Sequence, residues 1–157
     1  MQKQLAMTSA QKLKPAGGIA SAAVVPAGAA ACGSAAEIAA AAVAVPLAEG
    51  LSSYDEMTDS ADGTLRVEHR LTIAVPPEYV RDFIGRDVQR RWASEGTAAV
   101  ITTVAGERLV LGWSEHFGTE QPLRLTGMAV STGTTPREIP AVVLTFRSVD
   151  TSPASRL

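Results

Sequence analysis

The sequence predicts a mainly β protein of the α+β class, an antiparallel β-sandwich or rolled barrel with one flanking α-helix at about residues 77–93. Residues 64–75, TLRVEHRLTIAV, alternate apolar and polar side chains with the period of two that a half-buried strand requires. Residues 76–94 instead place apolar side chains at the three- and four-residue steps of a helix. Strands are predicted on both sides of this helix without repeated strand–helix alternation, which favours an antiparallel sheet.

Length and composition indicate one domain. The chain has 157 residues, of which 46% are hydrophobic and 4% aromatic, enough to bury a core without disulfides. We divide it into an extended arm at 1–17, a single β-rich domain at 18–150 and a polar C-terminal tail at 151–157. The net charge of −2 predicts no affinity of the whole chain for nucleic acids or membranes.

The first part of the domain contains three segments of different composition. Residues 18–25, GIASAAVV, predict a strand that a proline closes. The alanine-rich residues 27–48 fit either a helix or a small-residue strand, and we favour the strand because helix caps are few. Residues 47–63 carry five acidic side chains and no cation and end in Asp-Gly, which indicates a solvated loop and turn. A calcium loop fails there, since a frame with Gly63 sixth puts His69 in the twelfth, ligand position.

The strand and the helix that follow define the expected core. His69 lies within the apolar face of strand 64–75, so we expect a buried or interface histidine that is hydrogen-bonded to a neighbour. The helix begins near Pro77, a residue that the first helical turn tolerates, and its arginines and aspartates form a solvated face. We expect its apolar stripe to pack against the sheet or a neighbouring subunit; this stripe consists of Val80, Phe83, Ile84, Val88 and Trp92.

Strands are also predicted after the helix. Residues 97–104 and 107–113 flank Ala105-Gly106, a pattern typical of a tight hairpin. PLRLTGMAV and AVVLTFRSV form two further predicted strands, which the loop 131–140 connects.

Ser114, Glu115 and His116 are adjacent, which suggests a catalytic triad. In an extended segment, however, consecutive side chains point in alternate directions, whereas a hydrolase brings its triad together from separate elements. The chain also contains no nucleophile-elbow, phosphate-loop, dinucleotide-binding or zinc-protease motif. We therefore expect these residues to lie in a loop or an interface and the protein to have no enzymatic activity, with a hydrolase built on Ser114 and a histidine as the alternative.

The single cysteine, Cys32, excludes an intrachain disulfide and a cysteine-based metal cage. With only two histidines and no ligand-pair spacing, we expect no metal and no cofactor. The stretch KLKPAGGIASAAVVPAGAAAC permits a second interpretation, a secreted lipoprotein or binding β-domain. Its glycines and proline and the Ala29 three residues before the cysteine argue against a lipoprotein signal, and no run approaches the roughly 20 apolar residues of a membrane span.

Five stretches, in their order, resemble a family of small virion proteins that tailed phages and prophages of gut anaerobes encode in their structural modules. The stretches are GGIASAAVVPA, LAEGLSSYDE, LRVEHRLTIAVP, GERLVLGWSEHFGTEQPLRLTG and VVLTFRSVDTSPA. The resemblance covers about residues 17–155, and its most specific parts are the Leu-Gly-aromatic-Ser-Glu block with PLRL behind it and the closing LTFRSVDTSPA. The chain departs from the family in its alanine-rich 27–45 segment, where family members carry more ordinary β residues.

The resemblance implies a structural subunit of the phage tail without catalytic residues, first of all the tail tube protein. Its partners would be copies of itself in stacked hexameric rings and other tail proteins, with DNA passing non-specifically through the lumen. It would act in the virion tail after assembly in the host cytoplasm. A tail terminator or head–tail connector, which forms a single ring, is the alternative within this class.

We expect the acidic loop 49–63 and the arm at 1–17 to make contacts between subunits, since a terminal arm and long loops can bridge to neighbouring subunits and rings. The predicted interface residues are Glu49, Asp55, Glu56, His69, Arg90, Arg91, Trp113, Glu115, His116 and Arg137.

Overall fold

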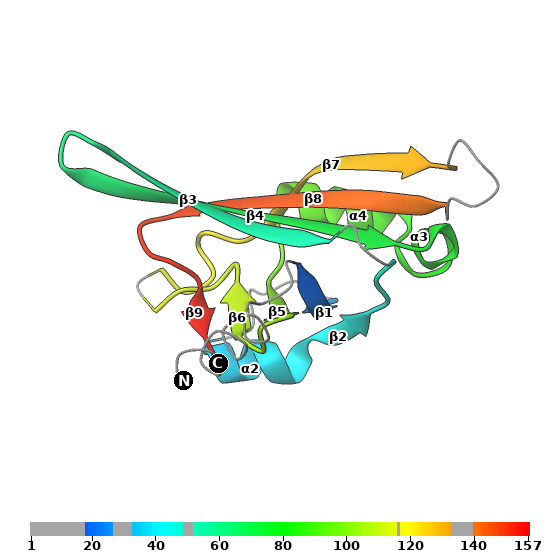
Figure 1. Cartoon of the computed structure of the whole chain (residues 1–157), viewed down its shortest axis with the longest axis horizontal. Coiled ribbons are helices and arrows are strands. Elements are labelled where there is room, and N and C mark those ends of the chain that lie inside the picture. Colours follow the sequence, from blue (N-terminus) through cyan, green and yellow to red (C-terminus); the bar gives the residue numbers. More distant parts are fainter. Residues whose placement is uncertain (1–17, 27–32, 49–51, 116, 133–139) are drawn as a thin grey trace, which may run out of the picture.

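The computed structural model describes residues 18–26, 33–48, 52–115, 117–132 and 140–157, so the expected arm at 1–17 and Cys32 lie outside the described residues. Two antiparallel sheets pack together with three helices, which confirms the predicted mainly β, α+β class (Figure 1). The five-stranded sheet has the order β2 (Val43–Val45), β1 (Ile19–Val24), β5 (Ala99–Thr103), β6 (Arg108–Leu111) and β9 (Ser155–Arg156). The four-stranded sheet has the order β3 (Ser53–Ala61), β4 (Thr64–Val75), β8 (Ala141–Asp150) and β7 (Arg124–Ser131).

The main core lies between the inner faces of the two sheets. Leu71 and Phe146 of the four-stranded sheet and Ile101 and Leu111 of the five-stranded sheet belong to one buried cluster. Trp92 joins this cluster from a helix, with its ring edge-on to Phe146 at 5.5 Å between ring centroids. The two sheets and the helices therefore form one domain.

Residues 53–61 of the acidic segment form a strand, so our prediction of a loop there was wrong. β3 pairs with β4 over nine consecutive residue pairs from Ser53–Thr72 to Ala61–Thr64. The predicted Asp-Gly turn is confirmed: Asp62 and Gly63 have φ values of 53° and 78°, the positive angles that a two-residue hairpin favours. The acidic side chains are compatible with a strand because β3 is at the edge of its sheet, where charge also discourages unwanted pairing.

The β3–β4 hairpin extends beyond the rest of the four-stranded sheet. Pairing between β4 and β8 ends at Val67 and Asp150, so the residues nearer the turn pair only across the hairpin. Figure 1 shows this part of the hairpin projecting at the left, at one end of the long axis of the molecule. β4 itself has the predicted limits, 64–75, and its predicted face is buried from Val67 onward, whereas Leu65, expected on the same face, is exposed.

The alanine-rich segment was predicted as a strand, which is wrong for most of its described part. Helix α2 (Ala35–Ala41) comes first, and only Val43–Val45 form a strand, β2. The amide of Glu37 donates to Ser34 Oγ at 3.2 Å, and its carboxylate accepts from the amide of Gly33 at 2.8 Å. This Ser-x-x-Glu cap and the fully buried Ile38 fix the helix.

The single helix predicted at 77–93 is two helices, α3 (Pro77–Phe83) and α4 (Arg86–Ser94). Ile84 leaves helical geometry and Gly85 is extended, with ψ of 174°. The break places Ile84 and Trp92 in the core, while Phe83, predicted in the apolar stripe, is 71% exposed. One continuous stripe was therefore the wrong expectation.

The other predicted strands are confirmed. β1, the β5–β6 hairpin, β7 and β8 occupy the expected segments. The C-terminal tail differs from the expectation, because β9 pairs with β6 through Leu109–Arg156 and Val110–Ser155. The chain thus crosses from one sheet to the other after β8.

Candidate functional site

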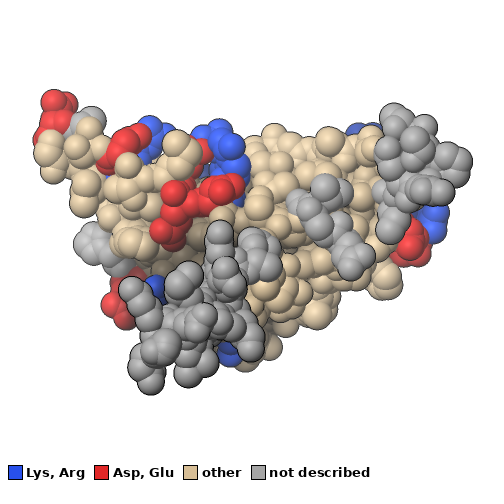
Figure 2. Space-filling view, viewed as in Figure 1, with Lys and Arg blue, Asp and Glu red and all other residues tan. Residues whose placement is uncertain are grey.

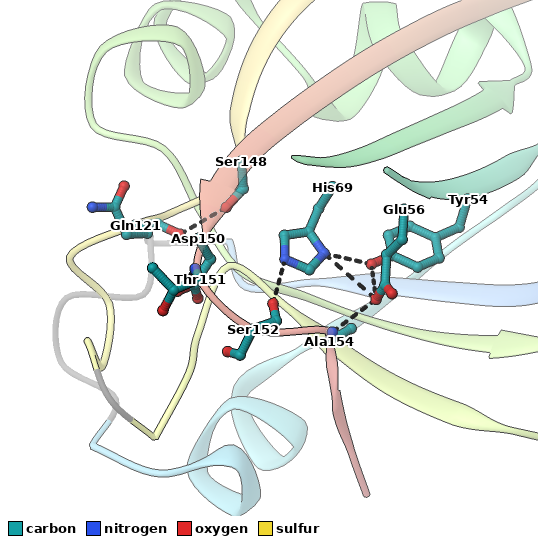
Figure 3. Close-up of polar contacts among 9 residues, drawn as sticks. All are labelled: Tyr54, Glu56, His69, Gln121, Ser148, Asp150, Thr151, Ser152 and Ala154. Carbon is teal, nitrogen blue, oxygen red and sulfur yellow. Dashed lines mark hydrogen bonds and ion pairs between the residues drawn. The ribbon is translucent and has the colours of Figure 1, made fainter. Parts of the chain in front are cut away.

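A polar cluster joins the base of the hairpin to the C-terminal crossing (Figure 3). Tyr54 and Glu56 of β3 and His69 of β4 lie on the same face of their sheet, because strand residues two apart share a face and Glu56 is directly opposite His69. After β8 ends, the amide of Thr151 donates to the carboxylate of Asp150 at 2.6 Å, and the chain turns toward β9 past the imidazole.

Four short contacts connect this cluster. His69 Nε2 is 3.1 Å from the carbonyl oxygen of Ser152, and Nδ1 is 2.6 Å from the Tyr54 hydroxyl. The hydroxyl is also 2.7 Å from Glu56 Oε1, which accepts the amide of Ala154 at 2.8 Å. Because His69 is only 6% exposed, these partners replace water around its ring. The prediction of a buried, hydrogen-bonded histidine is confirmed.

The protons of the cluster follow from its donors and acceptors. A carbonyl oxygen only accepts, so His69 Nε2 carries a proton for Ser152. The hydroxyl of Tyr54 donates one proton but has two close partners, Nδ1 and the carboxylate of Glu56. With a neutral imidazole and an ionised carboxylate, the hydroxyl can donate to only one of them. Making both hydrogen bonds at once requires one additional proton on the imidazole or the carboxylate. Burial, and then the hydrogen bond to Glu56, raise the pKa of Tyr54 well above its ordinary value, so its hydroxyl stays protonated.

These hydrogen bonds connect the β3–β4 hairpin to the segment between β8 and β9. The partners on the C-terminal side are backbone groups, which hold the crossing against the hairpin. The cavity beside His69 measures about 10 Å³, room for about one water molecule but not for a substrate. Ser148 of β8 adds a second tie at the same place, as its hydroxyl donates to the carbonyl oxygen of Gln121 at 3.0 Å.

The connection after β6 is a tight turn region, as expected. Ser114 is buried, its Oγ accepts the amide of Phe117 at 3.1 Å, and its backbone exchanges hydrogen bonds with Gly118. Trp113 packs on a second buried cluster beneath α2. Glu115 is exposed, and His116 lies outside the described residues. The hydroxyl of Ser114 therefore has a structural partner within its own turn.

The predicted interface residues that the structure describes lie on three parts of the fold, of which two meet where His69 and Trp113 line the same small cavity. Asp55, Glu56 and His69 lie on the hairpin, Arg90 and Arg91 on α4, and Trp113 and Glu115 after β6. Arg91 makes an ion pair with Glu95 at 3.0 Å. Glu49 and Arg137 lie outside the described residues. The contacts of these residues with other subunits stay a prediction.

A groove between α4 and β7 was not anticipated. It is an open depression of about 300 Å³, lined by Arg86, Gln89, Arg90, Ala93, Leu125, Thr126, Gly127 and Met128. The only sequence signal for it was the spacing of Arg86 and Arg90, which places both arginines on one side of the helix.

The uncovered face of β7 continues the groove. Met128 and Val130 pair with Leu144 and Val142 of β8, whose side chains are in the core, so they point to the inner side of the sheet. Nevertheless they are 43% and 66% exposed, so the described part of the chain leaves this part of β7 largely uncovered. An apolar strip therefore lies open along one edge of the four-stranded sheet.

The outer face of the hairpin and its neighbouring strands carries charges of both signs. Glu68 makes ion pairs with Arg70, at 3.6 Å, and with Arg147. Asp55 and Asp59 are directly opposite Arg70 and Arg66. Figure 2 shows acidic and basic side chains close together over the hairpin at the left, whereas the middle of that view has few charges.

Within the described ranges, no group of three or more His, Cys, Asp or Glu side chains is placed to hold a metal ion. None of the helices in these ranges has the length and apolar character needed to cross a membrane. Comparisons with protein-family models, curated proteins and solved structures found no match to this chain.

Proposed function

We propose that the chain is the tail tube subunit of a tailed bacteriophage or prophage, a structural protein that forms stacked hexameric rings around the DNA channel. The motivation is the order of the five stretches that resemble small virion proteins. Four of them supply the polar cluster and its second tie: Tyr54 and Glu56, His69, Gln121, and the segment 148–154. Residues that carry the resemblance thus serve to hold the fold together.

The observation that carries the proposal is the pair of unlike edges of the four-stranded sheet. One edge strand, β3, belongs to the projecting hairpin, and the other, β7, exposes an apolar strip beside the groove. No further strand pairs with either edge in the part of the chain that the structure describes. A monomer leaves both edges in water, whereas association of unlike edges covers them.

Contacts between unlike surfaces generate rings when the rotation closes and filaments when it does not. A ring of six small domains, each about 30 Å across, has an outer diameter on the order of 100 Å. Stacking of such rings gives a tube, and a single ring gives the terminator or connector alternative.

Electron microscopy of the purified full chain tests the proposal. We expect rings about 100 Å wide that stack into tubes, given domains of this size. Isolated rings at every concentration would favour the terminator or connector. A monomer that persists at high protein concentration would contradict the whole class.

A further inference from the structure

We propose that the distal hairpin, residues 57–68, of one copy docks in the groove between α4 and β7 of a second copy of this chain. The inference rests on the proposed ring-forming function and names the surfaces that join one subunit to the next. It follows from the shape, apolar side chains and charges of the two surfaces.

The distal hairpin has two large apolar side chains that are mostly exposed in the structure. Met57 and Leu65 are 65% and 55% exposed, and they lie on opposite faces of the hairpin. Residues 59–66, beyond the last β4–β8 pair, Val67–Asp150, pair only across the hairpin, and Met57 lies at the start of this projection, opposite Glu68. Large apolar side chains on both faces of a projecting hairpin are typical of a segment that a partner encloses.

The groove offers the complementary surface. Leu125 and Met128 of β7 supply apolar groups, and Arg86 and Arg90 of α4 supply two positive charges on one side. None of the residues that line the groove is acidic. The groove therefore favours an occupant that combines apolar and acidic side chains.

The hairpin has that composition. Residues 57–68 contain three acidic side chains, Asp59, Asp62 and Glu68, and one basic side chain, Arg66, so the distal hairpin is net acidic. Opposite charges around an apolar centre select the partner and fix the orientation of docking. A subunit does not fill its own groove, because the tip of the hairpin and the β7 region lie toward opposite ends of the molecule (Figure 1).

Each copy thus carries one hairpin and one groove, and the contact joins different surfaces. Such a contact leaves a free hairpin at one end and a free groove at the other until a ring closes. A symmetric dimer, in which the same patch of each copy meets, is a different arrangement. The two arrangements predict different results when a hairpin variant and a groove variant are mixed.

The experiment uses two variants of the full chain. The hairpin variant is Met57→Lys with Leu65→Lys, which removes the apolar groups and adds charge of the same sign as the groove, and the groove variant is Arg86→Glu with Arg90→Glu; all four positions are exposed. Arg81→Glu is the matched control, because Arg81 is an exposed arginine on α3 outside the groove. Molar mass is measured by light scattering after size-exclusion chromatography, and circular dichroism checks that each variant folds.

We expect the wild type and Arg81→Glu to form rings or larger assemblies and each double variant to be monomeric. An equimolar mixture of the two double variants should give a 1:1 dimer and nothing larger, because only one intact hairpin and one intact groove remain. Variants that assemble like the wild type, or a mixture that stays monomeric, would overturn the docking while the ring proposal stands. A monomeric wild type would overturn both.

Single charge substitutions provide a second test that does not depend on the folding of the double variants. Asp59→Arg alone and Arg90→Glu alone should each lower the assembled fraction. Their combination in one chain should restore it at least in part, since the charges are exchanged across the contact. Equal assembly of all three would contradict the docking.

Discussion

Replacing Tyr54 by Phe tests whether the polar cluster stabilises the fold. The change keeps the aromatic ring and removes only the hydroxyl, which contacts His69 Nδ1 at 2.6 Å and Glu56 at 2.7 Å. Nδ1 of the buried imidazole then loses its hydroxyl partner, whereas the carboxylate keeps the amide of Ala154. Leaving a buried polar atom unpaired costs about 1–3 kcal/mol, and the lost burial of the hydroxyl offsets part of this.

We therefore expect Tyr54→Phe to lower the free energy of unfolding by about 1–2 kcal/mol. For a chain of this length, that corresponds to a fall in Tm of about 2–8 °C. Urea unfolding followed by circular dichroism measures the free energy at one fixed protein concentration. Hydrogen exchange at the amide of Ala154 reports whether the C-terminal crossing loosens before the rest of the fold.

Tyr79→Phe provides the matched control. The Tyr79 side chain is half-buried on α3, and its hydroxyl makes no hydrogen bond within the described residues. The control should change the stability by less than about 0.5 kcal/mol, as is usual for substitutions that break no specific contact. Equal effects of the two substitutions would refute the reasoning, since the loss would then not come from the cluster.

Three further predictions concern the free energy of unfolding: the effect of a core substitution, the effect of two glycine substitutions, and the dependence on alkaline pH. Phe146→Ala should lower the free energy of unfolding by about 3–5 kcal/mol in urea unfolding, because it opens a cavity beside Trp92. Gly112→Ala should destabilise the fold more than Gly63→Ala in the same assay: both glycines have a φ near +80°, but only at Gly112 would a Cβ lie 2.5 Å from a backbone oxygen. The raised pKa of Tyr54 keeps its hydroxyl protonated in the folded state, whereas in the unfolded chain the hydroxyl ionises above its ordinary pKa of about 10. The free energy of unfolding should therefore fall as the pH rises above about 10, and Tyr54→Phe should weaken this loss.

The parts of the fold that sequence predicted are those that local periodicity determines. β4 has the expected limits because its apolar side chains alternate over the whole strand. α2 was missed although Ser34 and Glu37 have the spacing of a capping box, a signal that the alanine content obscured. The break at Gly85 was missed because its apolar neighbours continue the helical spacing on both sides.

The candidate site could be predicted only in part for a different reason. The alternation in β4 predicted that His69 would be buried, but its partner Ser152 lies 83 residues away along the chain. Ala154 is 98 residues from Glu56. Such contacts depend on the crossing from β8 to β9, for which the polar C-terminal residues give no periodic signal. The groove likewise depends on where α4 lies relative to β7, which no local pattern states.

The cluster and the docking proposal are linked by the position of the hairpin. Tyr54, Glu56 and His69 lie at the base of the projection and bind the C-terminal crossing there, so that the base is held on two sides. A segment that is already ordered loses less conformational entropy when it binds a partner. In the proposed docking, the cluster would contribute without touching the second subunit, because it holds the base of the hairpin and so fixes the direction in which the hairpin leaves the sandwich. In the proposed assembly, residues within the stretches that resemble virion proteins would act through the fold, and the contacts themselves would come from the more distal part of the hairpin.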